Sequence, residues 1–137
     1  AVYTTLITHS TSWENTPQKF KTPREFYIST CRALGAPKLR KGFIVRTLRD
    51  LGQAPFKAGS PAGYEDTAAF WNNGYGILAR IDWISTLGNQ KQKDIPTLAR
   101  LVLGSSLTET TFQMIKRAES RERALALLFL SPEFMRR

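Results

Sequence analysis

Two residues that occur once each in the chain, His9 and Cys31, are the first candidates for chemistry. Nucleophilic catalysis needs a nucleophile beside a base, and a dyad of Cys31 and His9 would meet that requirement. The helical spacing of Cys31 between Tyr27 and Leu34 favours a different role, that of a small apolar side chain buried on a helix face. Both hypotheses stay open, and we favour the buried cysteine.

Metal and cofactor motifs are weak in this sequence. One histidine and one cysteine supply no metal-ligand spacing. The segment Gly74-Tyr75-Gly76 lacks a following glycine and a preceding strand, so it does not predict a phosphate-binding loop. Glu65 and Asp66 could act as paired carboxylates, but Asp66 is better explained as the cap of a helix. We therefore expect neither a cofactor nor a metal ion.

A loop marked by glycines and prolines, Gly52–Tyr64, precedes the longest predicted helix. It carries Phe56 and Tyr64, which a purely solvated linker would not need, so it is a candidate place for function. We expect both rings to pack on the following helix and Arg80 to donate hydrogen bonds to carbonyls of the loop. Contact of Arg80 with a ligand is the alternative. The candidate ligand-binding residues are Gln53, Phe56, Tyr64, Trp71 and Arg80.

The chain is basic, with 20 lysines and arginines against 11 aspartates and glutamates and a formal net charge of +9. Such an excess favours an anionic partner, or simply keeps a protein dispersed. The candidate polyanion site lies within residues 38–51 and consists of Lys38, Lys41, Arg46 and Arg49. These residues lack the interleaved exposed aromatics that single-strand binding requires. We interpret this face as solvated surface, and we do not expect nucleic acid as a partner.

Helix signals divide the first half of the chain. Residues 1–13 predict a short helix, weakened by their threonine content. The segment Thr22-Pro23-Arg24-Glu25 is typical of a helix start, because it offers a capping threonine, a proline in the first position and a glutamate that bonds back to the cap. That helix is expected to end at Gly35. Apolar residues at helical spacing predict the next helix over 38–51.

The longest predicted helix runs from its cap at Asp66 to about Leu87. Its expected buried face includes Phe70, Ile81 and Ile84, with Trp71 also in the core. The interior glycines at positions 74 and 76 each cost roughly 1 kcal/mol relative to alanine. That cost indicates either a close approach of another backbone or a local break in the helix.

Three further helices are predicted to begin at Asp94, at the Ser106–Glu109 capping box and at Ser120. The run Ala124–Leu130 is apolar all round, which predicts a helix buried on most sides. Glycines fall where helices should end, and no alternating strand pattern lies between them. The sequence therefore predicts an all-α fold, a single compact domain of about six helices over residues 1–137 with one long glycine- and proline-marked loop.

Four blocks of the sequence occur together and in order in one bacterial family: KTPREFYISTCRALGA, LGQAPFKAGSPAGYEDTAAFW, ILARIDW and LALLFLSPEFMRR. The chain resembles the C-terminal part of the bacterial domain-of-unknown-function family 1800. Tyr64 departs from the tryptophan that many members carry after the loop glycine. The resemblance implies a mostly helical portion of a longer, exported protein, and hence a periplasmic location. No activity is established for that family, so the resemblance implies no reaction.

These observations favour a helical binding or assembly domain of an exported bacterial protein. Its partner would be the rest of its own parent chain or another exported protein. One alternative is a wall of an active site completed by a missing N-terminal portion, and another is a polyanion-binding module. Whether the chain belongs to an enzyme stays open. No apolar run approaches the ~18 residues that a membrane-spanning helix needs.

Overall fold

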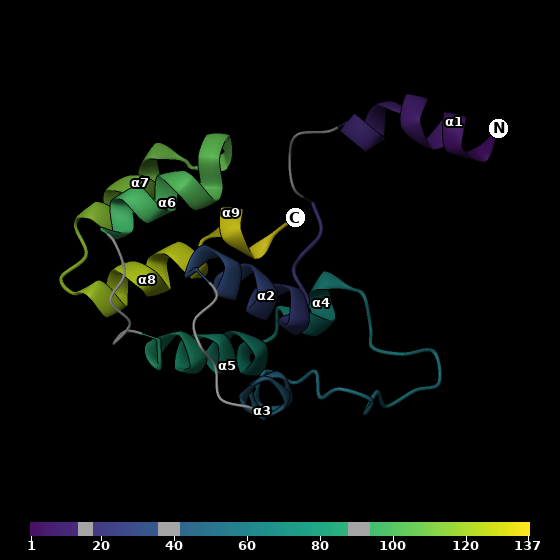
Figure 1. Ribbon diagram of the computed structural model, residues 1–137, viewed down its shortest axis with the longest axis horizontal. Coiled ribbons are helices and arrows are strands. Elements are labelled where there is room, and N and C mark those ends of the chain that lie inside the picture. Colours follow the sequence, from purple (N-terminus) through teal and green to yellow (C-terminus); the bar gives the residue numbers. More distant parts are fainter. Residues whose placement is uncertain (14–17, 36–41, 88–93) are drawn as a thin grey trace.

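The computed structural model describes residues 1–13, 18–35, 42–87 and 94–137 (Figure 1). Within these ranges every regular element is a helix, apart from one isolated β-bridge. The all-α prediction is confirmed, with more helices than the six expected. The elements are α1 (Val2–Thr8), the 3-10 turn η1 (Ser10–Trp13), α2 (Pro23–Ala33), α3 (Phe43–Asp50), α4 (Ala68–Trp71), α5 (Gly74–Ser85), α6 (Ile95–Leu103), η2 (Gly104–Ser106), α7 (Glu109–Lys116), α8 (Arg121–Phe129) and α9 (Pro132–Met135).

The start of α2 follows the predicted capping box. The Thr22 hydroxyl accepts a hydrogen bond from the Glu25 amide, and the Glu25 carboxylate accepts one from the Thr22 amide at 2.9 Å. Two backbone donors that the helix itself cannot satisfy thus find partners. The helix buries Phe26, Tyr27 and Thr30, as the spacing predicted. Phe26 contacts Trp83 of α5 and Phe134 of α9, and Tyr27 also contacts Trp83.

The prediction of one long helix from Asp66 to Leu87 is wrong, because the chain breaks between α4 and α5. The Asn73 side chain accepts from the Gly76 amide at 2.8 Å and donates to the Phe70 carbonyl at 2.6 Å. An asparagine that bonds its neighbours' backbone in this way competes with the helix ladder and begins a new helix. Asp66 caps no helix and instead forms an ion pair with Lys19.

The break also changes which residues are buried. The buried face of α5 carries Arg80, Trp83 and Ile84, whereas Ile81 is 38% exposed. In α4, Trp71 is buried as expected, but Phe70 is 47% exposed, against the prediction. The irregular turn at Asn73 separates Phe70 from the register of α5, and within α5 the buried residues Arg80 and Trp83 take the inner face in place of Ile81.

The C-terminal half begins its helices largely where the sequence predicted. Asp94 caps α6 and Ser120 caps α8 through their side-chain oxygens. The predicted capping box at Ser106 is wrong, because Ser106 ends the turn η2 and Thr108 caps α7 instead. Thr108 is better placed since its hydroxyl also donates to Glu133 of α9 at 2.6 Å, which ties two helix starts together.

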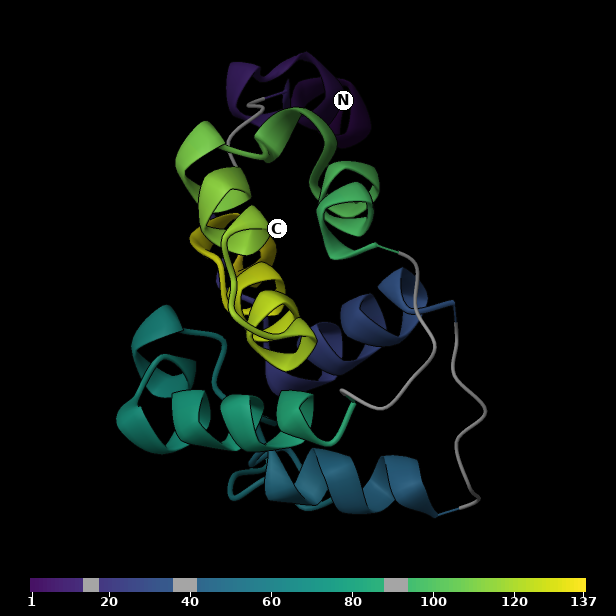
Figure 2. The ribbon, with the colours of Figure 1, turned by 90° about the vertical axis from the view of Figure 1, so that its left-hand side faces the viewer.

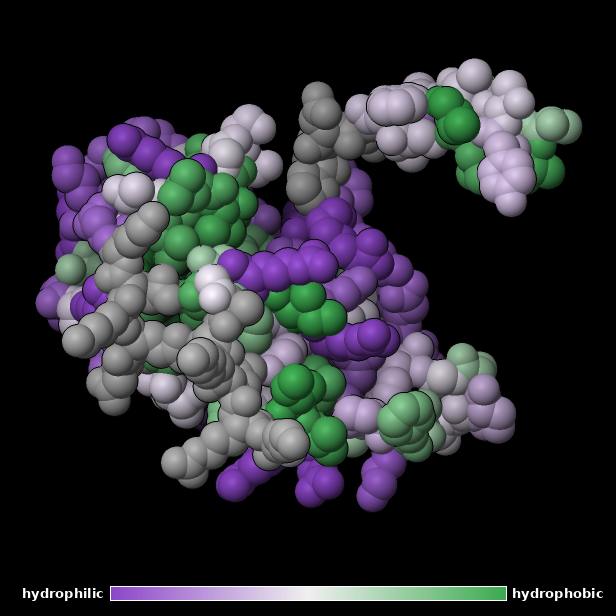
Figure 3. All heavy atoms as spheres, viewed as in Figure 1, coloured by the Kyte–Doolittle hydropathy of each residue, from purple (hydrophilic) through white to green (hydrophobic). Residues whose placement is uncertain are grey.

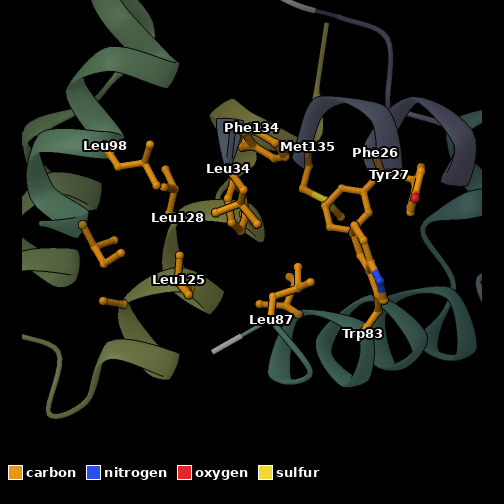
Figure 4. Packing of buried hydrophobic residues seen from close by; sticks show 14 of the residues in the cluster. Phe26, Tyr27, Leu34, Trp83, Leu87, Leu98, Leu125, Leu128, Phe134 and Met135 are labelled. Carbon is orange, nitrogen blue, oxygen red and sulfur yellow. The ribbon is translucent and has the colours of Figure 1, made fainter. Parts of the chain in front are cut away.

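The hydrophobic core surrounds α8, which contacts α5, α6, α7 and α9 (Figure 2). Leu125, Leu128 and Phe129 of this helix are fully buried, so the prediction of a helix buried on most sides is confirmed. Figure 4 shows Leu98 of α6 beside Leu128 of α8, while Phe26 and Tyr27 of α2 meet Trp83 of α5. Leu87, just past the end of α5, lies in the same cluster. No helix in the described part of the chain is both long and apolar enough to cross a membrane.

Of the predicted helix over 38–51, α3 covers Phe43–Asp50, and residues 38–41 lie outside the described ranges. Helix α3 buries Thr47 and Leu48, and Leu51 follows in the core, whereas Ile44 is 48% exposed. Gly52 has a φ of +90°, a left-handed conformation that favours glycine and ends the helix as predicted. Figures 1 and 2 show α3 on the side of α5 that faces away from α8, next to the long loop.

Candidate functional site

The segment 19–21 pairs with the last residues of the chain and closes over α5. The amide of Lys21 donates to the Met135 carbonyl at 2.8 Å, and Lys19 and Arg137 exchange two backbone hydrogen bonds of 3.1 and 2.9 Å. The sequence carried no strand signal here, because a single antiparallel bridge is too short to show an alternating pattern. This bridge places the backbone of Lys21, just before α2, against the backbone of Met135.

Arg80 lies beneath this bridge and is only 1% exposed. Its Nη2 donates to the Lys21 carbonyl at 2.7 Å, and its Nη1 donates to the Met135 sulfur at 3.1 Å. The guanidinium lies 4.8 Å from the Phe20 ring centre and 4.7 Å from that of Phe26. Burial lowers its pKa to about 10. Arg80 is therefore a buried structural arginine, as we favoured, but it holds the bridge and not the Gly52–Tyr64 loop.

A hollow of about 200 Å³, here called the Arg80 hollow, opens between the start of α2, the end of α3 and the break between α4 and α5. Trp71, Tyr75 and Arg80 contribute to its lining. Gly76 also lines it, and a Cβ atom at that position would lie 2.7 Å from the Trp71 carbonyl oxygen. Both alternatives raised for the interior glycines are therefore present: a close backbone approach at Gly76 and a helix break before Gly74.

A second hollow of about 400 Å³, the loop hollow, is lined by Gln53, Phe56 and Tyr64. The Gln53 side chain accepts a hydrogen bond from the Arg24 amide at 2.8 Å, which ties the loop to the start of α2. The Tyr64 hydroxyl donates to the Ala54 carbonyl at 2.6 Å and closes the loop on itself. One polar contact to the start of α2 and one within the loop therefore hold it in place.

The two loop aromatics behave differently. Tyr64 packs near Trp71, with ring centres 6.0 Å apart, and this contact confirms its predicted packing. Phe56 is fully exposed, so the prediction that it packs on the following helix is wrong. Its φ of +58° lies in the left-handed region, which is uncommon for a bulky residue and is found where surrounding structure imposes it.

The five candidate ligand-binding residues are divided between these hollows. Trp71 and Arg80 line the first, and Gln53, Phe56 and Tyr64 line the second. Both hollows take walls from the start of α2 and the end of α3, so they are neighbours. The arrangement offers aromatic faces and amide and hydroxyl groups, which suit a small organic ligand. That these residues bind a ligand stays a prediction.

The structure does not bring the candidate dyad together. His9 is exposed, its Nδ1 accepts from the Thr11 amide at 3.3 Å, and α1 stands apart from α2 in Figure 1. Cys31 is half-buried on α2, where burial raises the pKa of its thiol and opposes formation of the thiolate. Among the described residues no three potential metal ligands cluster.

The candidate polyanion face is only partly within the described ranges. Arg46 and Arg49 are exposed on α3, and Arg46 lies 3.8 Å from Asp50. Lys38 and Lys41 lie outside the described residues. An exposed pair of this kind contributes little to stability. Polyanion binding by this face stays untested.

One feature was missed by sequence reasoning. Residues 1–13, here called the arm, are exposed throughout and project from the rest of the molecule (Figures 1 and 3). The predicted helix forms, but its apolar side packs on nothing within the described structure. The exposed apolar side chains are Val2 at 72%, Tyr3 at 82%, Leu6 at 58%, Ile7 at 61% and Trp13 at 68%. Periodicity alone cannot reveal what an apolar side faces.

The described ranges thus define an all-α protein with two neighbouring hollows, a buried arginine and an exposed apolar arm. The chain belongs to the family described as proteins of unknown function, DUF1800, whose family model matches residues 1–136. This match confirms the resemblance drawn from the four sequence blocks. Comparisons with curated proteins and with solved structures found no match.

Proposed function

We propose that the chain is a helical binding and assembly domain of an exported bacterial protein, and that its arm docks into an apolar groove of another protein. The supporting observation is the exposure of the apolar side chains on residues 1–13. Burial of such surface contributes roughly 25 cal/mol for each Å² removed from water. A seven-residue helix such as α1 is also marginal in isolation, so a partner would stabilise it.

The composition of the arm argues for a protein partner over a membrane surface. Residues 1–13 contain no lysine, arginine, aspartate or glutamate. Helices that lie on membranes usually carry basic residues on the polar face, which attract anionic lipid. Helices that dock into protein grooves are instead defined by apolar side chains three or four positions apart. Tyr3 and Ile7 have this spacing, as do Val2 and Leu6.

Photo-crosslinking in the source cells tests the docking. A photoreactive side chain at position 6 should give a discrete protein adduct, which mass spectrometry identifies. Purified partner should then bind the wild-type chain and lose affinity for Ile7→Ser, because an anchor side chain is removed. The control is Leu78→Ser, since Leu78 is 61% exposed on α5 and lies outside the arm. A chain that stays monomeric and gives no adduct would overturn the proposal. An adduct formed only with a second copy of the chain would show self-association and would contradict docking into another protein.

Export is the part of the proposal that depends on the family resemblance. Cell fractionation tests it directly, and we expect the parent protein in the periplasmic fraction. Recovery of the protein only with cytoplasmic markers would contradict export.

A wall of an active site is the second candidate, favoured by the Arg80 hollow and the loop hollow lying side by side. Comparing this chain with its full-length parent on generic esterase, phosphatase and glycosidase substrates tests this alternative. Activity in the parent that is lost on replacing Gln53 or Tyr64 would favour it over assembly alone.

A further inference from the structure

A third hollow, separate from the two described above, lies where α2, α6 and α9 meet. It has a volume of about 570 Å³, and we call it the α2–α6 groove. One side is apolar, with Leu101 and Val102 of α6, and Phe134 of α9 adds an aromatic wall. Figure 3 shows hydrophobic atoms over α6 next to hydrophilic atoms on the α2 and α9 side.

Three basic residues from separate segments line this groove: Lys21, Arg32 and Arg136. None of them forms an ion pair with a carboxylate among the described residues, whereas Lys19, Arg46, Arg123 and Arg137 each do. A cation that forms no ion pair and lines a hollow can receive an anionic group, and guanidinium groups match carboxylate and phosphate geometry. The groove thus concentrates positive charge beside apolar surface.

Two carboxylates lie beside this charge, Glu25 and Glu133. Glu25 accepts hydrogen bonds from Thr22 and forms an ion pair with Arg137 at 2.7 Å. Glu133 lines the groove, and its Oε1 accepts from Thr108, the cap of α7, at 2.6 Å and from Thr111 at 2.8 Å. Its Oε2 is buried without a hydrogen-bond partner among the described residues. Neither neutralises the groove through a direct contact with Lys21.

We propose that the α2–α6 groove binds an organic anion that has an apolar chain, with its carboxylate or phosphate held by Lys21, Arg32 and Arg136 and its chain lying along α6. The state of Lys21 supports this assignment. The Lys21 Nζ lies 4.0 Å from the Phe134 ring centre. Burial lowers the pKa of Lys21 to about 8, and the neighbouring charges of Arg80 and Arg137 act in the same direction, whereas Glu25 acts in the opposite one. A bound anion would favour the charged form of Lys21.

Calorimetric titration of the whole chain tests the proposal with two probes, octanoate and octyl phosphate. Inorganic phosphate and octanol separate the two halves of the recognition, because one lacks the apolar chain and the other lacks the charge. We expect at least one probe to bind about tenfold or more tightly than both comparison compounds. If octanol binds as tightly as the anionic probes, the groove does not recognise the anionic group. If inorganic phosphate binds as tightly, the groove does not recognise the apolar chain.

Substitutions locate the site. Arg32→Gln and Arg136→Gln should each weaken probe binding about tenfold, because each removes a hydrogen bond to a charged group. Both side chains are exposed, so their loss should leave the fold intact, which the thermal unfolding midpoint verifies. Arg117→Gln is the matched control and should bind normally, because Arg117 is exposed at the end of α7 and does not line the groove. Unchanged affinity in both groove variants, or no binding of either probe at millimolar concentration, would overturn the proposal.

The pH dependence gives an independent check. Lys21 loses its proton near pH 8, so affinity should fall between pH 7 and pH 9.5, and Lys21→Met should show weaker binding with a flatter profile. The charged groups that influence Lys21 are Glu25, Arg80 and Arg137. A profile identical in wild type and Lys21→Met would remove Lys21 from the site.

Discussion

Replacement of Arg80 by alanine should destabilise the protein by about 3–5 kcal/mol. The side chain is 1% exposed and donates to the Lys21 carbonyl at 2.7 Å. Loss of a hydrogen bond from a charged donor costs about 1.5–3 kcal/mol. Truncation of a large buried side chain adds a cavity cost of about 2 kcal/mol or more. Relief from burying an unpaired charge offsets part of that sum.

The effect should also be local to the bridge that Arg80 holds. Chemical denaturation followed by circular dichroism gives the free energy of unfolding, and hydrogen exchange reports on individual amides. We expect the amides of Lys21 and Arg137 to lose protection in Arg80→Ala, because their bonds join the segments that Arg80 supports. Arg80→Met keeps most of the buried volume and should lose less stability than Arg80→Ala.

Arg49→Ala is the control for charge. Arg49 is exposed on α3, and substitutions of that kind usually change stability by no more than about 0.5 kcal/mol. An Arg80→Ala variant as stable as the wild type would refute the structural role. A variant more stable than the wild type would indicate that Arg80 is kept for a ligand at the expense of stability.

Two further predictions follow from local geometry and charge. Gly76→Ala should lower the free energy of unfolding by about 1–3 kcal/mol, because the new Cβ would lie 2.7 Å from the Trp71 carbonyl oxygen. Gly74→Ala meets open space and should raise the free energy of unfolding by about 0.4–1 kcal/mol. Equal effects of the two substitutions in a denaturant titration would contradict this geometry. The lowered pKa of Lys21 means that the unfolded chain binds the extra proton between about pH 8 and 10.5, so wild type should gain stability relative to Lys21→Met as pH rises from 7.5 to 9.5. A difference between these two proteins that is independent of pH would show that Lys21 is not perturbed.

Short-range signals in the sequence were sufficient for the helical fold. The capping box at Thr22, the caps at Asp94 and Ser120 and the glycine stop at Gly52 are each made by residues within four positions of one another. Their physics is local, because a backbone amide at a helix end is satisfied by the nearest suitable side chain. The apolar run Ala124–Leu130 likewise predicted the central position of α8.

Other features depended on contacts between distant segments. Arg80 meets a carbonyl 59 positions away and a sulfur 55 positions away, so no local pattern could name its partners. The burial of Arg80 and Trp83 centres the inner face of α5 on those residues and Ile84, and Ile81 is left exposed. The arm has the same apolar spacing that elsewhere marks a core helix. Only the tertiary structure shows that its apolar side chains face solvent, since periodicity identifies an apolar face without specifying what covers it.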